Sequence, residues 1–234
     1  MSPARNPIFV AIDTPDLDRA LALSHSVAPH VGGLKVGLEF ITARGPDGIR
    51  AIMATGLPVF ADTKFHDIPN TVAGAAREIA KLGVAMFNIH ASGGAAMMRA
   101  AKEAAASVNP AVRLIAVTVL TSMDDAVLGE VGQRTPAADQ VVRLASLAQE
   151  SGLDGVVCSA HEIAALRSAC GSDFLLAVPG IRPRGGDVAD QRRVMTPAEA
   201  ARAGADILVI GRPITAAPDP SQAARDIRAS LPSD

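Results

Sequence analysis

The residues of this chain best suited to chemistry lie in the run Asp62–Thr71, which holds Asp62, Lys64 and Asp67. The run follows an apolar segment that we expect to be a strand, Leu57–Lys64, and precedes an expected helix. Asp62 and Lys64 are two positions apart, so on a strand their side chains leave the same face. Two acids and a cation that converge where a strand ends can bind a polar ligand and transfer a proton. The run therefore predicts a catalytic site.

The composition limits the kinds of protein to which this site can belong. A chain of 234 residues can form one large domain or two small ones with a substantial core. Its 22 basic and 24 acidic residues nearly cancel, so no bulk charge attracts nucleic acid or an anionic membrane. No apolar stretch reaches the roughly 18 residues of a membrane span, and Met1–Pro7 does not look like a signal peptide. Cys158 and Cys170 match no metal or redox spacing and are interpreted as buried, inert thiols of a reducing compartment. We expect a cytoplasmic protein with no nucleic-acid or membrane partner.

Short apolar runs alternate along the chain with Ala-rich stretches of helical periodicity. The expected strands are Ile8–Asp13, Leu34–Leu38, Leu57–Asp62, Val84–His90, Leu114–Leu120, Gly155–Ser159, Phe174–Val178 and Ile207–Ile210. The expected helices include Leu17–Val27, Ile68–Leu82, Gly94–Ala106, Ala137–Ser151, His161–Ala169 and Pro197–Ala203. Such alternation predicts an α/β fold with a parallel sheet, and eight doubly buried strands favour a (β/α)8 TIM barrel over an open sheet. No linker divides the chain, so residues 1–234 are predicted to form a single barrel domain.

In a barrel the carboxyl ends of all strands meet at one mouth, and here they carry polar side chains. The expected mouth residues are Asp13, Lys35, Asp62, Lys64, Asn88, His90, Thr121 and Ser122. Acids alternate with bases in this set, which reduces the cost of desolvating each charge. A lysine between two aspartates should stay protonated, so Lys64 is interpreted as a proton donor and not as a Schiff-base nucleophile.

Each of these residues also has a structural interpretation. Asp67 precedes Pro69 by two residues and suits a helix cap, as does Asp13 for a helix near residue 15. Lys35 can extend its ammonium group to the barrel rim. His66 and His90 lack partners at metal-ligand spacing and are more often structural hydrogen-bonding groups. Taken singly the residues favour structure, whereas four or five charges at one mouth favour function.

A second polar cluster follows the last two expected strands. Gly180 and Arg182 come after the seventh strand, Gln191 lies further along that loop, and Gly211 and Arg212 come after the eighth. These two loops of a barrel commonly bind phosphate, with backbone N–H groups and an arginine as donors. The alternative is that the glycines only permit tight turns and the arginines are solvated. We expect a phosphorylated substrate, with the loop of residues 179–190 as a lid.

The ordered set of motifs closely resembles the orotidine 5'-phosphate decarboxylase family over nearly the whole chain, in its bacterial form. The segments that carry the resemblance are Asp62-Thr63-Lys64-Phe65-His66-Asp67-Ile68-Pro69-Asn70-Thr71, Leu34-Lys35-Val36-Gly37, Ala116–Ser122, Gly152–Cys158, Pro179-Gly180-Ile181-Arg182, Asp190-Gln191 and Gly211-Arg212.

The resemblance implies loss of CO2 from orotidine 5'-phosphate to give UMP, the last step of de novo pyrimidine nucleotide synthesis, with no cofactor and no metal. By this analogy Lys64 protonates C6 of the pyrimidine, and Asp62 sits beside the departing carboxylate. Lys35 and Asp13 hold the ribose and fix the charge network. Thr121 or Ser122 contacts the base, and the phosphate ligands are Arg182, Gln191, Gly211 and Arg212. The family's homodimer further implies that Asp67 and Thr71 enter the partner's pocket.

Two alternatives differ from this interpretation. A metal-dependent sugar-phosphate decarboxylase or aldolase of the same superfamily shares the Asp-x-Lys-x-x-Asp pattern, but it carries a Mg2+-binding carboxylate where this chain has Lys35. A catalytically silent nucleotide-binding barrel, used for sensing or assembly, belongs to a different class. Its binding task does not require so costly a cluster of charges.

Overall fold

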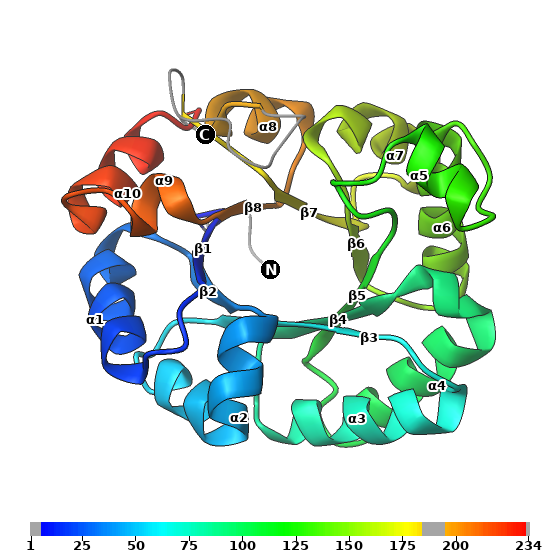
Figure 1. Cartoon of the computed structure of the whole chain (residues 1–234), viewed down its shortest axis with the longest axis horizontal. Coiled ribbons are helices and arrows are strands. Elements are labelled where there is room, and N and C mark those ends of the chain that lie inside the picture. The colour runs from blue at the N-terminus through cyan, green and yellow to red at the C-terminus, as the bar shows by residue number, and fades with distance from the viewer. Residues whose placement is uncertain (1–5, 184–194, 233–234) are drawn as a thin grey trace.

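Eight parallel strands close into a barrel in sequence order, with β1 paired to both β2 and β8, which confirms the predicted (β/α)8 fold (Figure 1). The computed structural model describes residues 6–183 and 195–232. The strands are β1 (Ile8–Ile12), β2 (Gly33–Val36), β3 (Val59–Phe65), β4 (Met86–His90), β5 (Arg113–Val117), β6 (Gly155–Val157), β7 (Leu175–Pro179) and β8 (Ile207–Ile210).

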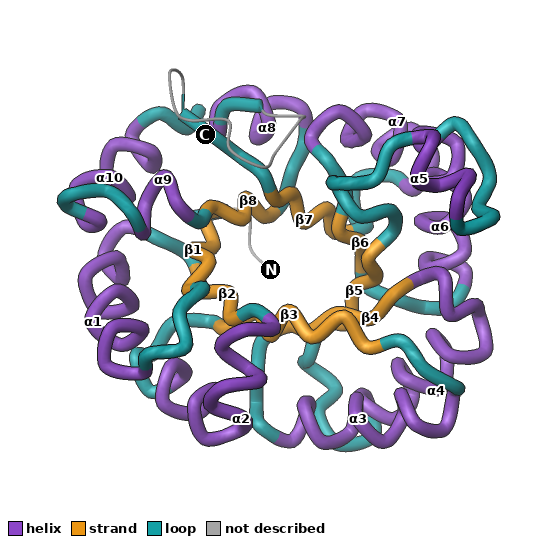
Figure 2. Tube along the Cα trace, viewed as in Figure 1, coloured by secondary structure: helices purple, strands orange, loops and turns teal. Residues whose placement is uncertain are grey.

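Helices surround the strands as an outer ring, purple around orange in Figure 2. In the described residues the α-helices are α1 (Leu17–Val27), α2 (Leu38–Met53), α3 (Pro69–Lys81), α4 (Gly94–Ala106), α5 (Asp125–Glu130), α6 (Ala137–Glu150), α7 (Ile163–Cys170), α8 (Pro197–Ala203), α9 (Arg212–Thr215) and α10 (Pro220–Ala229). The 3-10 helices are η1 (Ala28–His30), η2 (Ala91–Gly93) and η3 (Ala160–Glu162). None of the helices in this part of the chain is long and apolar enough to cross a lipid bilayer.

The predicted boundaries hold where the sequence carries local start and stop signals. For α1, Asp16 caps the first turn by accepting from the Arg19 N–H, and for α8 Thr196 and Glu199 form a reciprocal capping box. The expected strand Leu114–Leu120 is too long, because β5 ends at Val117. Beyond it Val119 is buried but Leu120 is 39% exposed, so the apolar residues there do not mark a longer strand. In contrast, β3 ends at Phe65, beyond both Asp62 and Lys64, the two expected ends of this strand.

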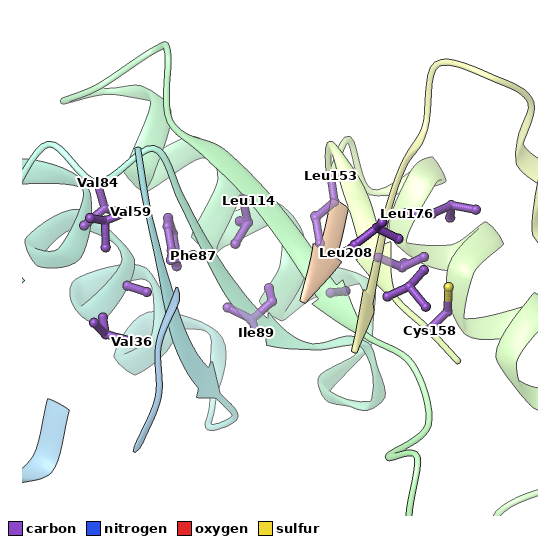
Figure 3. Close-up of a cluster of buried hydrophobic side chains, with 14 of the residues drawn as sticks. Val36, Val59, Val84, Phe87, Ile89, Leu114, Leu153, Cys158, Leu176 and Leu208 are labelled. Carbon is purple, nitrogen blue, oxygen red and sulfur yellow. The ribbon is translucent and has the colours of Figure 1, made fainter. Parts of the chain in front are cut away.

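The two faces of the strands build two separate apolar cores. The outer core joins the strands to the helices, and Figure 3 shows part of it, including Phe87, Leu114 and Leu176. The inner core fills the barrel with strand side chains alone: Phe9, Ala11, Phe60, Met86, Ile115, Ala177, Ile207 and Val209. Successive side chains on a strand alternate between faces, so residues two positions beyond these point inward, toward the mouth. Asp13, Asp62, Asn88 and Gly211 occupy such positions.

Two aspartates close the amino end of the barrel, opposite this mouth. Asp154 accepts the Leu114 N–H at 2.7 Å, and Asp206 accepts the Leu176 N–H at 2.7 Å. Arg167 pairs with Asp206 at 2.5 Å and also donates to several loop carbonyls. Each aspartate thereby ties one strand to the loop before the next, and the charges at this end serve the framework.

Candidate active site

Four charged side chains from three neighbouring strand ends form one continuous chain at the carboxyl end of the barrel. Lys35 Nζ lies 2.9 Å from Asp13 Oδ1 and 3.4 Å from Asp62 Oδ2. Lys64 Nζ lies 2.5 Å from the other oxygen, Asp62 Oδ1. The structure thus brings together the alternating acids and bases expected from the sequence, in the order Asp13, Lys35, Asp62, Lys64.

Because these side chains are buried, the electrostatic interactions between them are stronger than those of surface ion pairs. The side chains of Lys35 and Asp62 are only 9% and 14% exposed, and that of Lys64 is 28% exposed. Burial by itself raises the pKa of Asp62, but the ammonium groups of Lys35 and Lys64, with hydrogen bonds from Lys64 and Asn88, lower it on balance. Asp62 is therefore an anion at neutral pH.

The contacts also decide between structural and functional interpretations of three residues. Asp13 caps no helix, because Asp16 caps α1 and Asp13 is paired with Lys35. Lys35 is buried and does not extend to the rim. Asp67 does not cap α3: the residue at the cap position is Ile68, and Asp67 Oδ1 accepts only its N–H, at 2.6 Å. The capping and rim interpretations were wrong for all three.

Asp67 and Thr71 are not part of the charged chain. Within the described residues Asp67 forms no hydrogen bond or ion pair with the four charged groups, and it lies in an exposed stretch, residues 66–71. This stretch includes Ile68, whose side chain leaves the residue 67% exposed. The Asp62–Thr71 run is thus divided into a buried half that belongs to this mouth and an exposed half that faces outward.

The expected base ligands and the described phosphate ligands lie on loops at the same end. Thr121 and Ser122 follow β5; Thr121 is partly buried and Ser122 is exposed. Arg182 follows β7 and is 8% exposed, and Gly211 precedes α9, whose first residue is Arg212. Gln191 and most of the expected lid, residues 184–190, lie outside the described residues. Gly180, with φ of 77°, occupies the left-handed region that glycine tolerates, as expected of a tight turn.

Two histidines flank the charged chain. The rings of His66 and His90 lie 5.6 Å apart, tilted by 33°. Burial, the neighbouring His66 and the Lys64 ammonium lower the pKa of His90, so this imidazole is neutral at neutral pH. Among the residues that the structure describes, no three His, Cys, Asp or Glu side chains are grouped so as to hold a metal ion.

The two cysteines lie away from this site. Cys158 and Cys170 are free and buried, as expected. Burial raises the pKa of both thiols. They are therefore protonated and inert at neutral pH.

Asn88 was expected at the mouth, but the sequence assigned it no role in the site; it is 1% exposed and donates from Nδ2 to Asp62 Oδ1 at 2.7 Å. An amide within the otherwise apolar segment Met86–Ile89 was a signal of its role, because a fully buried amide requires specific partners.

Comparison with known proteins gives a consistent match. Residues 6–227 match the model of the family "Orotidine 5'-phosphate decarboxylase / HUMPS family". An orotidine 5'-phosphate decarboxylase of Moorella thermoacetica is 57% identical, covering 97% of this chain and 93% of the relative. One from Paramagnetospirillum magneticum is 54% identical over 97% and 98%. The crystal structure of the enzyme from Lactobacillus acidophilus superposes with a TM-score of 0.86 at 38% identity, over 97% of this chain and all of that one.

The lowered pKa of Asp62 predicts a pH-dependent stability. Because the folded-state pKa lies below the unfolded value of about 4, the ionised carboxylate stabilises the fold above that pH, and this contribution is lost as the pH falls through the folded pKa. Asp62→Asn should lower the free energy of unfolding at pH 7, and the difference from the native chain should shrink between about pH 5 and 3. Urea unfolding across this range measures it.

Asp47→Asn is the control, since Asp47 forms an exposed ion pair with Arg50 and should change stability little. A difference between native chain and Asp62→Asn that stays constant down to pH 3 would contradict the assigned charge of Asp62.

Proposed function

The chain belongs to the orotidine 5'-phosphate decarboxylase / HUMPS family, and from this premise we propose that it converts orotidine 5'-phosphate to UMP and CO2 without metal or organic cofactor, with Lys64 as the proton donor. The assignment as an orotidine 5'-phosphate decarboxylase, a carboxy-lyase of pyrimidine biosynthesis, rests on the family match and on relatives at 53% to 57% identity. The mechanism is argued from the site.

The observation that carries the mechanism is the buried contact between Lys64 and Asp62. The Lys64 ammonium is 2.5 Å from a carboxylate that a second ammonium, Lys35, also contacts. The carboxylate holds the Lys64 ammonium group in a partly buried site at the mouth, where the Lys64 side chain is 28% exposed. A protonated amine held in one place, next to a fixed negative charge, suits proton delivery to carbon.

The proposed reaction uses these two charges in sequence. Orotidine 5'-phosphate binds with its C6 carboxylate near Asp62 and its C6 atom near Lys64 Nζ. The bond between C6 and the carboxylate breaks, CO2 leaves, and the electron pair stays on C6. Lys64 transfers a proton to C6 as the pair develops, which gives UMP and a neutral amine that solvent reprotonates. Asp62 disfavours the substrate carboxylate through charge repulsion and holds Lys64 in place.

Remote binding is proposed to supply part of the rate enhancement. A carbanion at C6 has no adjacent carbonyl to delocalise it, so the site must approach the upper part of the roughly 8–23 kcal/mol range of enzymatic stabilisation. Asp13 and Lys35 hold the ribose hydroxyls, Thr121 or Ser122 contacts the base, and a phosphate site on the loops after β7 and β8 positions the ring. The phosphate ligands we propose are Arg182, Gln191, Gly211 and Arg212.

The metal-free mechanism is supported by the charge of the site. Lys35 and Lys64 both contact Asp62, and two ammonium groups repel a divalent cation from the same carboxylate. The metal-dependent sugar-phosphate alternative needs a carboxylate where Lys35 stands. A silent binding barrel has no need for four charges that must be desolvated together. A location in the cytoplasm, and a single catalytic domain spanning residues 1–234, complete the proposal.

A homodimer with shared sites is proposed from the exposed half of the motif. Asp67 and Thr71 are exposed on either side of the exposed Ile68. If a second copy of the chain covers Ile68, both polar side chains lie close to the barrel mouth of that second copy. An aspartate from the partner adds a negative charge next to Lys64 and continues the alternation of acid and base.

Replacing the proposed donor should separate turnover from binding. We expect Lys64→Ala to lower kcat at least about 10³-fold, because proton transfer and the charge next to Asp62 are both lost. Binding of UMP should stay measurable. Conversion of orotidine 5'-phosphate is followed by absorbance, with Lys81→Ala as the control, since Lys81 forms an exposed ion pair with Glu78 on α3.

An unchanged rate in Lys64→Ala would refute the role of Lys64. The native enzyme treated with EDTA should keep its rate, and a loss that Mg2+ restores would refute the metal-free mechanism.

Mixed dimers test the shared site. Lys64→Ala and Asp67→Ala homodimers should each be nearly inactive, because each pocket lacks one group. A mixture that exchanges subunits should regain up to about a quarter of native activity, since half the dimers are hybrids and each hybrid has one intact pocket. Turnover of the mixture is compared with that of the separate variants. A mixture as inactive as its parents would place Asp67 in its own chain's pocket.

A further inference from the structure

The catalytic pair lies on an irregular part of the barrel. Between β3 and β4 the register pairs Ala61 with Phe87 and next Phe65 with Ile89. Three residues of β3, namely 62–64, therefore face a single residue of β4, Asn88. Such a bulge leaves main-chain groups without their ladder partners and redirects side chains.

Asn88 makes contact with all three residues of the bulge. Its Nδ2 donates to Asp62 Oδ1 at 2.7 Å, and its Oδ1 accepts the Lys64 N–H at 2.8 Å. Its main-chain carbonyl accepts from Thr63 Oγ1 at 2.7 Å. The side chain of Asn88 thus takes the place of the ladder partner that the bulge removes.

The orientation of the Asn88 amide is determined by its partners. A backbone N–H can only donate and an ionised carboxylate can only accept, so the amide oxygen must face Lys64 and the amide nitrogen must face Asp62. Both groups of the amide are used, and Asn88 is 1% exposed, so water cannot substitute for either.

The Lys64 backbone needs this support. Its φ is 51°, and Lys64 is the one non-glycine residue with positive φ in the described part of the chain. A non-glycine residue in the left-handed region is strained by about 1 kcal/mol or more, and it keeps this conformation only when the surrounding structure holds it. The hydrogen bond from the Lys64 N–H to Asn88 Oδ1 holds the nitrogen of the N–Cα bond, about which φ is defined.

We propose that Asn88 is a positioning residue for the decarboxylation: it fixes the Asp62 carboxylate and the Lys64 backbone in the one arrangement that aims both charged groups at the substrate. This rests on the proposed function, in which Asp62 and Lys64 act on C6. Asn88 itself touches neither substrate nor reacting atoms, so its removal affects the chemical step and leaves nucleotide binding nearly intact.

The first test is Asn88→Ala. We expect kcat to fall about 10²-fold or more, the effect of misplacing a reacting group by about 1 Å. The KM for orotidine 5'-phosphate and the Kd for UMP should change less than about threefold. A crystal structure of the variant should show Lys64 outside the left-handed region. A matched control for general destabilisation is Leu114→Ala, which creates a cavity in the outer core and should lower Tm while keeping kcat.

The second test is Asn88→Asp, which has the same shape and should fold. An ionised carboxyl at this position repels Asp62 and cannot donate to it, whereas a protonated one donates to Asp62 and accepts the Lys64 N–H, as the amide does. When two carboxyl groups are in contact, the pKa of one of them is raised, so the pair keeps a shared proton to a higher pH than a single carboxyl group does. The kcat of the variant relative to the native enzyme should therefore rise about tenfold between pH 8 and 5. The charged or titratable groups around this position are Asp62, Lys64, Lys35, His90 and His66.

A ratio of Asn88→Asp to native kcat that does not change with pH would overturn the proposal, as would an Asn88→Ala variant with Lys64 still left-handed. Failure of the proposed function gives a different result. If the native enzyme does not decarboxylate orotidine 5'-phosphate, the function is refuted, and the crystal structure of Asn88→Ala still decides whether Asn88 holds the Lys64 backbone.

Discussion

A carboxylate held between two ammonium groups is the interaction on which the mouth of this barrel depends. Asp62 contacts Lys35 with one oxygen and Lys64 with the other. Each of these charges alone would be costly in so buried a place, by several kcal/mol, and with Asp13 paired to Lys35 the two acids balance the two cations. The barrel makes the arrangement possible because β1, β2 and β3 are neighbours, so residues distant in sequence end at the same rim.

The two ends of the barrel use charge differently. At the amino end, Asp154 and Asp206 accept strand N–H groups and pair with cations, so their charges tie the framework together. At the carboxyl end the ladder is interrupted and Lys64 adopts a left-handed backbone. Strain at Lys64 is maintained because the rest of the barrel, with its two apolar cores, is regular.

The sequence predicted those features that depend on local pattern. The bounds of α1, α4 and α8 agree with the structure, and the strand count and the charged residues at the strand ends followed from alternation of apolar runs. The helix α2 was not among the expected helices, because Gly45 and Pro46 interrupt its periodicity and Gly45 is non-helical within it. The contact between Asn88 and the bulge could not be predicted, since it depends on a register shift between two strands. The outward position of Asp67 was implied only by resemblance to the family, because a single chain carries no information about its partner.

The proposed mechanism depends on one geometric relation, in which Lys64 delivers a proton to C6 of the pyrimidine. The most direct measurement is a crystal structure of the native enzyme with UMP bound. With Lys64 as the donor, we expect Lys64 Nζ within about 3.5 Å of C6, Asp62 on the side from which the carboxylate departs, and Asp67 contributed by the other subunit. A Lys64 Nζ more than about 5 Å from C6, with another acid in its place, would contradict it.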